Sequence, residues 1–210
     1  KLGKGWYLKS GVAFTIDEKN MDLQSFVVDE SNKNLQAKIT LKKSFSENAS
    51  VLFGAEETFN SFNQDYTETA TTFSNNSNFD DFNSAVYAEG DYRPIAKLAL
   101  RAGVRGEYSS LLNKSNVGAR LSAAVKITNS SQISLAYGNF YQTPEEDLLR
   151  FTHNLSFEKA NHYIANYQWE KSNRIFRIEA YRKDYKDLVT YNPEEYWNGD
   201  FYKNSGGGHS

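Results

Sequence analysis

The stretch KLALRAGVRGEYSSLLNKSNVGARLSAAVKIT, residues 97–128, decides the fold class because apolar and polar residues alternate along it. In its first half Leu98, Leu100 and Val104 alternate with Arg101 and Arg105, and its second half repeats this pattern. A period of two residues is that of a β-strand with one apolar and one polar face. The stretch therefore predicts two successive strands, whose apolar face packs either on a protein core or on lipid.

The composition excludes several classes of protein. The chain has 210 residues, a net charge of −2 and no cysteine, so nothing indicates nucleic acid binding, a disulfide scaffold or a thiolate metal site. It contains no run of about 18 apolar residues, which a membrane-spanning helix needs. It starts at Lys1 rather than Met, which indicates a processed chain or a piece of a longer one. Aromatic residues reach 15% and prolines number three, as is typical of an all-β protein.

The alternation predicts nine strands and the start of a tenth near Gly208. Each has roughly ten residues or more, whereas strands of soluble domains have about 5–6 and a tilted membrane-spanning strand needs about 9–11. Strand length therefore favours an antiparallel membrane barrel over a soluble sheet. The predicted strands are Gly5–Asp17, Asn34–Phe45, Ala49–Phe62, Asp81–Tyr92, Lys97–Ser109, Ser115–Thr128, Gln132–Gln142, Asn161–Glu170 and Arg174–Tyr191.

Short and long connections alternate along most of the chain, with Ser110–Lys114 as the exception. In an up-and-down sheet this puts tight turns at one end and long loops at the other, as in outer-membrane barrels with short periplasmic turns and long external loops. The tight turns are Ser46–Asn48, Arg93–Ala96, Asn129–Ser131 and Lys171–Asn173. The long loops are Glu18–Lys33, Asn63–Asp80, Thr143–Ala160 and Asn192–Gly207. We expect Asn63–Asp80 to be mobile because it is polar.

The pattern also assigns the two faces of the sheet. A lysine or arginine in the middle of the lipid face costs about 2–4 kcal/mol, so the charged face should look into a wet interior. On this basis Arg101, Arg105 and Arg120 line the lumen. Tyrosines and tryptophans near strand ends should form belts at the lipid–water boundaries. These aromatic residues are Trp6, Tyr7, Tyr87, Tyr92, Tyr108, Tyr137, Tyr141, Tyr163, Tyr167, Trp169, Tyr181 and Tyr185.

The long loops carry the candidate ligand contacts. Thr143 and Glu146 have the spacing of a capping box, which together with a proline at the first helical position predicts a short helix from Pro144 to Phe151. Aromatic side chains on such loops can stack on a sugar or a hydrophobic ligand, or pack on their loop neighbours. We expect the ligand-binding residues to be Phe151, Tyr196, Trp197 and Tyr202.

No catalytic pattern stands out in the sequence. His153, His162 and His209 lack the spacing of a metal site, and Glu56 and Glu57 should point to opposite faces of a strand. No serine lies in a nucleophile elbow. We therefore expect no enzymatic activity, no metal site and no cofactor.

Five motifs follow one another in the second half of the chain: a Tyr-Gly step, YQTPE, EKANHY, YQ and FRIEAYRKDYKDLV. In this order they resemble the barrel of TonB-dependent outer-membrane receptors, notably those of Bacteroidetes-type bacteria. The upstream segment Ala85–Ser110 looks like a mid-barrel hairpin of the same family. The motifs occupy Tyr137–Gly138, Tyr141–Glu145, Glu158–Tyr163, Tyr167–Gln168 and Phe176–Val189.

The resemblance implies a barrel of about 22 strands in the outer membrane of a Gram-negative bacterium, plugged by an N-terminal domain. Such receptors bind a scarce nutrient with external loops and import it with energy from the TonB complex. It also implies that residues 1–210 are an internal barrel segment of nine to ten strands, without the plug domain and the C-terminal strands. The expected partners are outer-membrane lipid, the plug domain, the TonB complex through regions outside this sequence, a surface lipoprotein, and a siderophore, cobalamin, glycan or peptide ligand.

Two alternatives stay open at this point. Ten strands could form a complete small outer-membrane barrel, acting as an adhesin or a surface enzyme, since such barrels have even strand numbers. A soluble β-sandwich that binds glycans would instead press the apolar faces of two sheets together. The packing of the apolar face separates the sandwich from both barrels.

Overall fold

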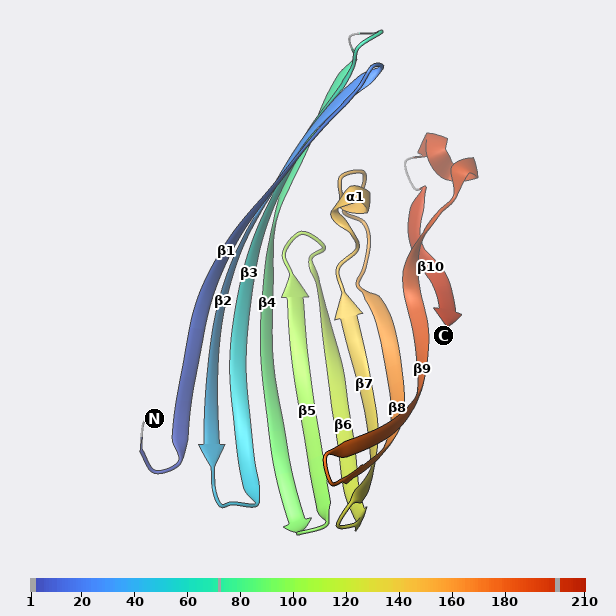
Figure 1. Cartoon of the computed structure of the whole chain (residues 1–210). Coiled ribbons are helices and arrows are strands. Elements are labelled where there is room, and N and C mark those ends of the chain that lie inside the picture. Colours follow the sequence, from blue (N-terminus) through green and yellow to red (C-terminus); the bar gives the residue numbers. More distant parts are fainter. Residues whose placement is uncertain (1–2, 72, 199–200) are drawn as a thin grey trace.

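The computed structural model describes residues 3–71, 73–198 and 201–210, and for residues 196–198 only the backbone. The described residues form one antiparallel sheet of ten strands, each paired with its neighbours in sequence, which confirms the predicted all-β, up-and-down architecture (Figure 1). Among the described residues no helix is long and apolar enough to cross a membrane. The strands are β1 (Trp6–Leu23), β2 (Phe26–Ser44), β3 (Ala49–Glu68), β4 (Ser74–Ile95), β5 (Leu98–Ser109), β6 (Lys114–Thr128), β7 (Ser131–Gln142), β8 (Glu158–Lys171), β9 (Arg174–Tyr191) and β10 (Tyr202–His209).

Strand register determines which residues share a face, because directly opposed residues of an antiparallel pair point to the same side. Leu100 lies opposite Ala123 of β6, and Arg101 lies opposite Asp91 of β4. We call the side with Leu100 the apolar face and the side with Arg101 the polar face. Arg105 and Arg120 also lie on the polar face, as the alternation predicts.

The apolar face has no protein layer packed on it in the described part of the chain. Val12, Val86 and Val117 on this face are 74%, 64% and 66% exposed. All ten strands belong to the same sheet, which forms a single curved layer (Figure 1). A soluble sandwich would bury these side chains between two sheets, so the packing contradicts the glycan-binding sandwich.

The first four strands are longer than the sequence pattern predicts. β1 and β2 continue through most of the expected loop Glu18–Lys33, and β3 and β4 through most of Asn63–Asp80. The expectation of a long loop at Asn63–Asp80 is therefore wrong. Figure 1 shows these hairpins projecting well past the ends of β5, β6 and β7. We call this projection, residues 18–33 and 62–80, the blade.

Polar side chains hold the blade together where aliphatic ones are scarce. Asn76 Nδ2 donates to Asp65 Oδ1 at 2.6 Å and to Asn63 Oδ1 at 3.2 Å, both across the β3–β4 pair. Asn20 donates to Asp29 across the β1–β2 pair. Cross-strand polar pairs contribute roughly 0.2–1 kcal/mol each, so the strands extend without an apolar stripe.

The C-terminal part and the aromatic residues also differ from the prediction. Most of the expected loop Asn192–Gly207 forms a short 3-10 helix, Pro193–Asn198, and the first residues of β10. Tyr7, Tyr87, Tyr181 and Tyr185 lie on the polar face, because they oppose residues of that face on β2, β5 and β8. These four tyrosines therefore do not belong to a lipid-facing aromatic belt.

The loop between β7 and β8 folds over the polar face. Its helix α1 (Glu146–Leu149) is shorter than predicted, and its N-cap, Glu145, makes no side-chain capping bond, so the predicted capping box is wrong. Apolar residues of the loop instead join a buried cluster with β3, β4 and the β5–β6 turn, which holds the loop against the sheet. The cluster consists of Phe62, Phe79, Leu112, Leu149, Leu155 and Phe157.

Candidate ligand path on the polar face

The polar face carries a cluster around the ring of Tyr87. The ring lies over Gly54 of β3, where an added Cβ would be only 2.1 Å from the ring Cζ, so any side chain there would displace the ring. Thr40 Oγ1 is 3.1 Å from Tyr87 Oη. Lys38 Nζ and Arg105 Cζ lie 5.6 and 5.5 Å from the ring centroid, within the range of cation–π contacts. We call these five residues and Glu56 the Tyr87 cluster.

Glu56 forms ion pairs with both cations of the Tyr87 cluster. Its carboxylate lies 3.4 Å from Lys38 Nζ and 3.3 Å from Arg105 Nη1. It also accepts a hydrogen bond of 2.6 Å from Gln36 Nε2. Arg105 forms a further ion pair with Glu107. The predicted lumen residue Arg105 is thus paired with carboxylates of its own wall.

Arg101, the second predicted lumen residue, is paired in the same way. Its Nε lies 2.7 Å from Asp91 Oδ1 and 3.3 Å from Glu89 Oε1, both on β4. An arginine with two carboxylate partners has little net charge to offer a ligand. Arg101 therefore contributes mainly to the cross-strand bonding between β4 and β5.

Arg120, the third predicted lumen residue, has different surroundings. Its guanidinium Cζ lies 4.7 Å from the ring centroid of Phe140, and among the described residues it pairs with no carboxylate. The same ring lies 4.6 Å, centroid to centroid, from the ring of His162. It also covers Gly138, where an added Cβ would be 2.7 Å from the ring Cε2. We call these four residues the Phe140 cluster.

A pocket of about 290 Å³ opens beside the Phe140 cluster on the polar face. Its lining includes Arg120, Phe140 and His162, and also the ion pair of Glu89 with Arg101. The pocket therefore combines a guanidinium that is unpaired within the described residues, an imidazole and an aromatic ring with a carboxylate that already has a partner.

A second pocket, of about 420 Å³, lies between the β7–β8 loop and the polar face of β3 and β4. Glu146 connects the loop to the sheet, accepting hydrogen bonds from Asn32 Nδ2 at 2.6 Å and from Asn60 Nδ2 at 2.5 Å. Arg150 donates to Gln64 from the same loop. These contacts join residues far apart in sequence and fix the loop across the polar face.

Two of the four predicted aromatic ligand contacts lie side by side. The ring centroids of Phe151 and Tyr202 are 5.8 Å apart, and Phe151 is 50% exposed. Tyr191 extends the group, with its ring 5.5 Å from that of Tyr202. The side chains of Tyr196 and Trp197, the other two predicted contacts, lie outside the described residues. The role of all four residues in ligand binding stays a prediction.

The sequence analysis does not predict the two rings that cover glycines. The available signal is a glycine inside a strand on the polar face, since such a glycine often marks a close approach by another group. Gly54 and Gly138 both fit that description. The covering ring is harder to identify, because one comes from the opposite strand and the other from two residues along the same strand.

Outside the strands that cross the membrane, Glu195 ties the 3-10 helix to β10. Lys203 Nζ donates to Glu195 Oε2, and Asn192 Nδ2 donates to Glu195 Oε1 at 3.3 Å. The hydrogen bond from Lys203 lowers the pKa of the Glu195 carboxyl. The ionised carboxyl therefore helps to hold the 3-10 helix against β10.

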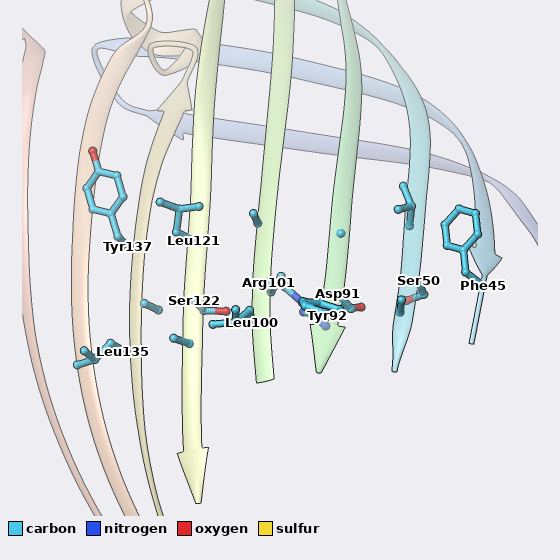
Figure 2. A pocket seen from close by; sticks show the side chains of 16 residues that line it. Phe45, Ser50, Asp91, Tyr92, Leu100, Arg101, Leu121, Ser122, Leu135 and Tyr137 are labelled. Atoms are coloured by element: carbon cyan, nitrogen blue, oxygen red, sulfur yellow. The ribbon is translucent and has the colours of Figure 1, made fainter. Parts of the chain in front are cut away.

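The apolar face has a shallow depression of about 670 Å³ on the side of the tight turns. Figure 2 shows Leu100, Leu121 and Leu135, from the neighbouring strands β5, β6 and β7, at this depression. Small residues such as Ala102 and Ala123 leave the space between them. Because its lining is mainly apolar and includes the leucines of the apolar face, the depression belongs to the lipid-facing surface and not to the ligand path.

Comparison with known proteins agrees with this arrangement. A family model described as TonB dependent receptor-like, beta-barrel, matches residues 2–210. The curated proteins contain no match to the chain. The family and the fold are those of transporters rather than enzymes, which agrees with the expectation of no catalytic activity.

Several solved receptors share the fold at low sequence identity. The chain is similar to FpvA of P. aeruginosa bound to pyoverdines (TM-score 0.77, 10% identity, 100% of this chain and 35% of that chain). It is also similar to the ferric-catecholate import receptor Fiu of E. coli (0.70, 12%, 99% and 42%) and to the RagAB peptide transporter (0.69, 14%, 97% and 31%).

The chain spans less than half the length of each of these structures. The Bacteroidetes-type origin expected from the motifs stays a prediction. The family model, in contrast, covers nearly every residue. The chain therefore belongs to the TonB-dependent receptor β-barrel family.

Proposed function

We propose that this chain is part of the wall of a TonB-dependent transporter that binds a scarce nutrient with its external loops and imports it. Proteins of this family lie in the outer membrane of Gram-negative bacteria. The observation that carries the proposal is the single-layer sheet, with an apolar face free of protein cover in the described residues and a polar face that bears Arg101, Arg105 and Arg120. Such a sheet suits a wall with lipid on one side and water on the other.

We infer that the chain is an internal segment of a larger barrel, of about 22 strands as in the plugged class of transporters. In the described sheet β1 and β10 each have a partner strand on one side only. An open sheet edge is not tolerated in lipid, because its backbone groups lack hydrogen-bond partners. The alternative, a complete ten-stranded barrel, requires β1 to pair with β10, which does not occur in the described sheet.

Ligand recognition is assigned to the loops, with no covalent step. Phe151 and Tyr202 present aromatic surface at the loop end of the sheet, and we expect Tyr196 and Trp197 to act with them in stacking on the ligand. The candidate ligands are a siderophore, cobalamin, a glycan or a peptide. The names of the similar receptors mention a ferric catecholate, pyoverdines and a peptide.

The proposed partners follow from the two faces and the two ends of the sheet. Outer-membrane lipid surrounds the apolar face, and the plug domain fills the lumen next to the polar face. The TonB complex delivers energy through regions outside residues 1–210. A surface lipoprotein is proposed at the loop end, where the blade offers an extended edge (Figure 1).

Two experiments on the full-length parent protein test this function. Deletion of its gene should abolish growth on one member of a panel of ferric siderophores, cobalamin, glycans and peptides, and loss of TonB should have the same effect. Leu121→Arg on the apolar face should block membrane assembly, at a cost of about 2–4 kcal/mol, whereas Ser122→Arg on the polar face should not. Heat-modifiable gel migration reports assembly. Unchanged growth on every nutrient, or normal assembly of Leu121→Arg, would contradict the proposal.

A further inference from the structure

The Tyr87 cluster and the Phe140 cluster are built alike but differ in charge. In each, an aromatic ring covers a strand glycine on the polar face and a cation lies against the ring. In the Tyr87 cluster Glu56 forms an ion pair with both cations, and Glu107 forms another with Arg105. In the Phe140 cluster no described carboxylate pairs with Arg120. The second cluster therefore leaves a guanidinium charge without an anionic partner in the wall.

Strand register extends the Phe140 cluster into a row of nitrogen-bearing side chains. Arg120 of β6 lies opposite Gly138 of β7, which lies opposite His162 of β8, which lies opposite Lys183 of β9. Neighbouring strands are about 4.8 Å apart, so the row spans about 14 Å. Lys183 Nζ lies 5.6 Å from the ring centroid of Tyr181 and, like Arg120, forms no ion pair with a described carboxylate. We call Arg120, His162 and Lys183 the basic row.

The carboxylates around the basic row are already engaged or too distant. Glu89 lies in register with Arg120 across Gly103 and lines the same pocket, but its carboxylate pairs with Arg101, as does that of Asp91. Asp184 pairs with Arg182 on the apolar face. Glu179 is four residues before Lys183 on β9, which corresponds to about 13 Å along a strand. The basic row therefore keeps its positive charge within the described wall.

The pocket beside Phe140 gives the basic row a recess on the polar face. Its volume of about 290 Å³ is at the lower end for small-molecule sites, and Arg120 and His162 both line it. The ring of Phe140 lies against both the guanidinium and the imidazole. Side chains held in place before binding lose less entropy when a ligand arrives.

We propose that the basic row binds the anionic group, a carboxylate or a phosphate, of the nutrient carried by the transporter, an inference that rests on the proposed function. Arg120 supplies a planar donor pair suited to such groups, His162 a ring N–H, and Lys183 a charged ammonium. The row lies near the middle of β6, β8 and β9, so it would act inside the lumen rather than at the loops.

The test uses the full-length parent receptor purified in detergent, with citrate as the anionic probe and raffinose as the neutral one. Isothermal titration calorimetry compares Arg120→Gln and Lys183→Gln with wild type. The matched control is Arg177→Gln, on the same polar face but outside the row, where the guanidinium donates to Gln168 Oε1 at 2.9 Å. We expect each row variant to weaken citrate binding about tenfold, equivalent to about 1.4 kcal/mol, and the control to leave it unchanged. The heat measured with raffinose should be the same for wild type and for the row variants.

Three results would overturn the site. The first is a wild-type receptor that does not bind citrate, and the second is equal weakening by Arg120→Gln and Arg177→Gln. The third is an Arg120→Gln receptor that is less heat-stable but binds citrate with unchanged affinity. This result would mean that the row pairs with an acidic segment of the parent chain instead of a ligand. The growth assay above reports the transport function separately. If growth depends on the gene but any of these three results is found, the site is refuted and the proposed function stands. If citrate binding depends on the row but growth does not depend on the gene, the function alone is refuted.

Discussion

Replacing Glu56 by glutamine removes the charge that holds the Tyr87 cluster together, and we expect it to destabilise the barrel wall. The carboxylate lies 3.4 Å from Lys38 Nζ and 3.3 Å from Arg105 Nη1. The side chain of Glu56 is 14% exposed, that of Arg105 25% and that of Lys38 50%. Water therefore screens the pair with Arg105 less than the pair with Lys38.

The magnitude follows from these exposures. A hydrogen bond to a charged group contributes about 1.5–3 kcal/mol when shielded, and an exposed ion pair about 0–1 kcal/mol. The bond from Arg105 belongs near the lower end of the first range, and the pair with Lys38 belongs to the second. Together they predict that Glu56→Gln lowers the free energy of unfolding by about 2 kcal/mol.

Urea unfolding of the refolded full-length receptor, followed by heat-modifiable migration, measures this loss. A double-mutant cycle with Arg105→Gln isolates the pair and should give a coupling energy of about 1 kcal/mol. The matched control is Glu57→Gln, on the apolar face, where the carboxylate accepts a hydrogen bond from Ser84 Oγ at 2.6 Å. Equal losses for Glu56→Gln and Glu57→Gln, or a coupling energy of zero, would refute this reasoning.

Three further predictions concern the glycine contact, the loop and pH. Gly54→Ala should lower the free energy of unfolding by about 1–3 kcal/mol, because its Cβ would displace the ring of Tyr87. Gly11→Ala should not, because nothing lies within 4 Å of its added Cβ. An equal urea midpoint for the two variants would contradict this prediction. Glu146→Gln should speed limited proteolysis of the β7–β8 loop by weakening its bonds to β2 and β3, and Glu145→Gln should leave the rate unchanged. The pKa of Glu195 in the folded protein lies below its ordinary value of 4.5, so the stabilisation from its ionised carboxyl is present above pH 4.5 and is lost as the pH falls through the folded pKa. Hydrogen exchange near the 3-10 helix should therefore accelerate only in acid. Glu195→Gln should remove this pH dependence.

The strands that cross the membrane could be predicted from sequence because their two faces differ sharply in chemistry. Arg101 and Arg105 alternate with Leu98, Leu100 and Val104, and only one orientation keeps the arginines out of lipid. The blade lacks this contrast, because polar residues occupy both faces of its strands. Its length depends on cross-strand hydrogen bonds between amide and carboxylate side chains, which the periodicity of the sequence does not predict.

The candidate site was less predictable because its geometry depends on contacts between distant residues. The spacing of Thr143 and Glu146 indicates a capping box, yet the carboxylate binds Asn32 and Asn60, which are 114 and 86 residues away. Similarly, the position of Arg120 on the polar face follows from alternation alone. That it lacks a carboxylate partner within the described residues, unlike Arg101, depends on which strands lie beside it.

The pairing of every strand with its neighbours in sequence also affects how such a wall is assembled. Each hairpin joins residues that are close along the chain, so little entropy is lost in bringing its two halves together. Proteins dominated by local contacts fold faster than those that depend on distant ones. The growing sheet can therefore template each new hairpin on the previous one, and only the final seam of a closed barrel has to unite distant ends of the polypeptide.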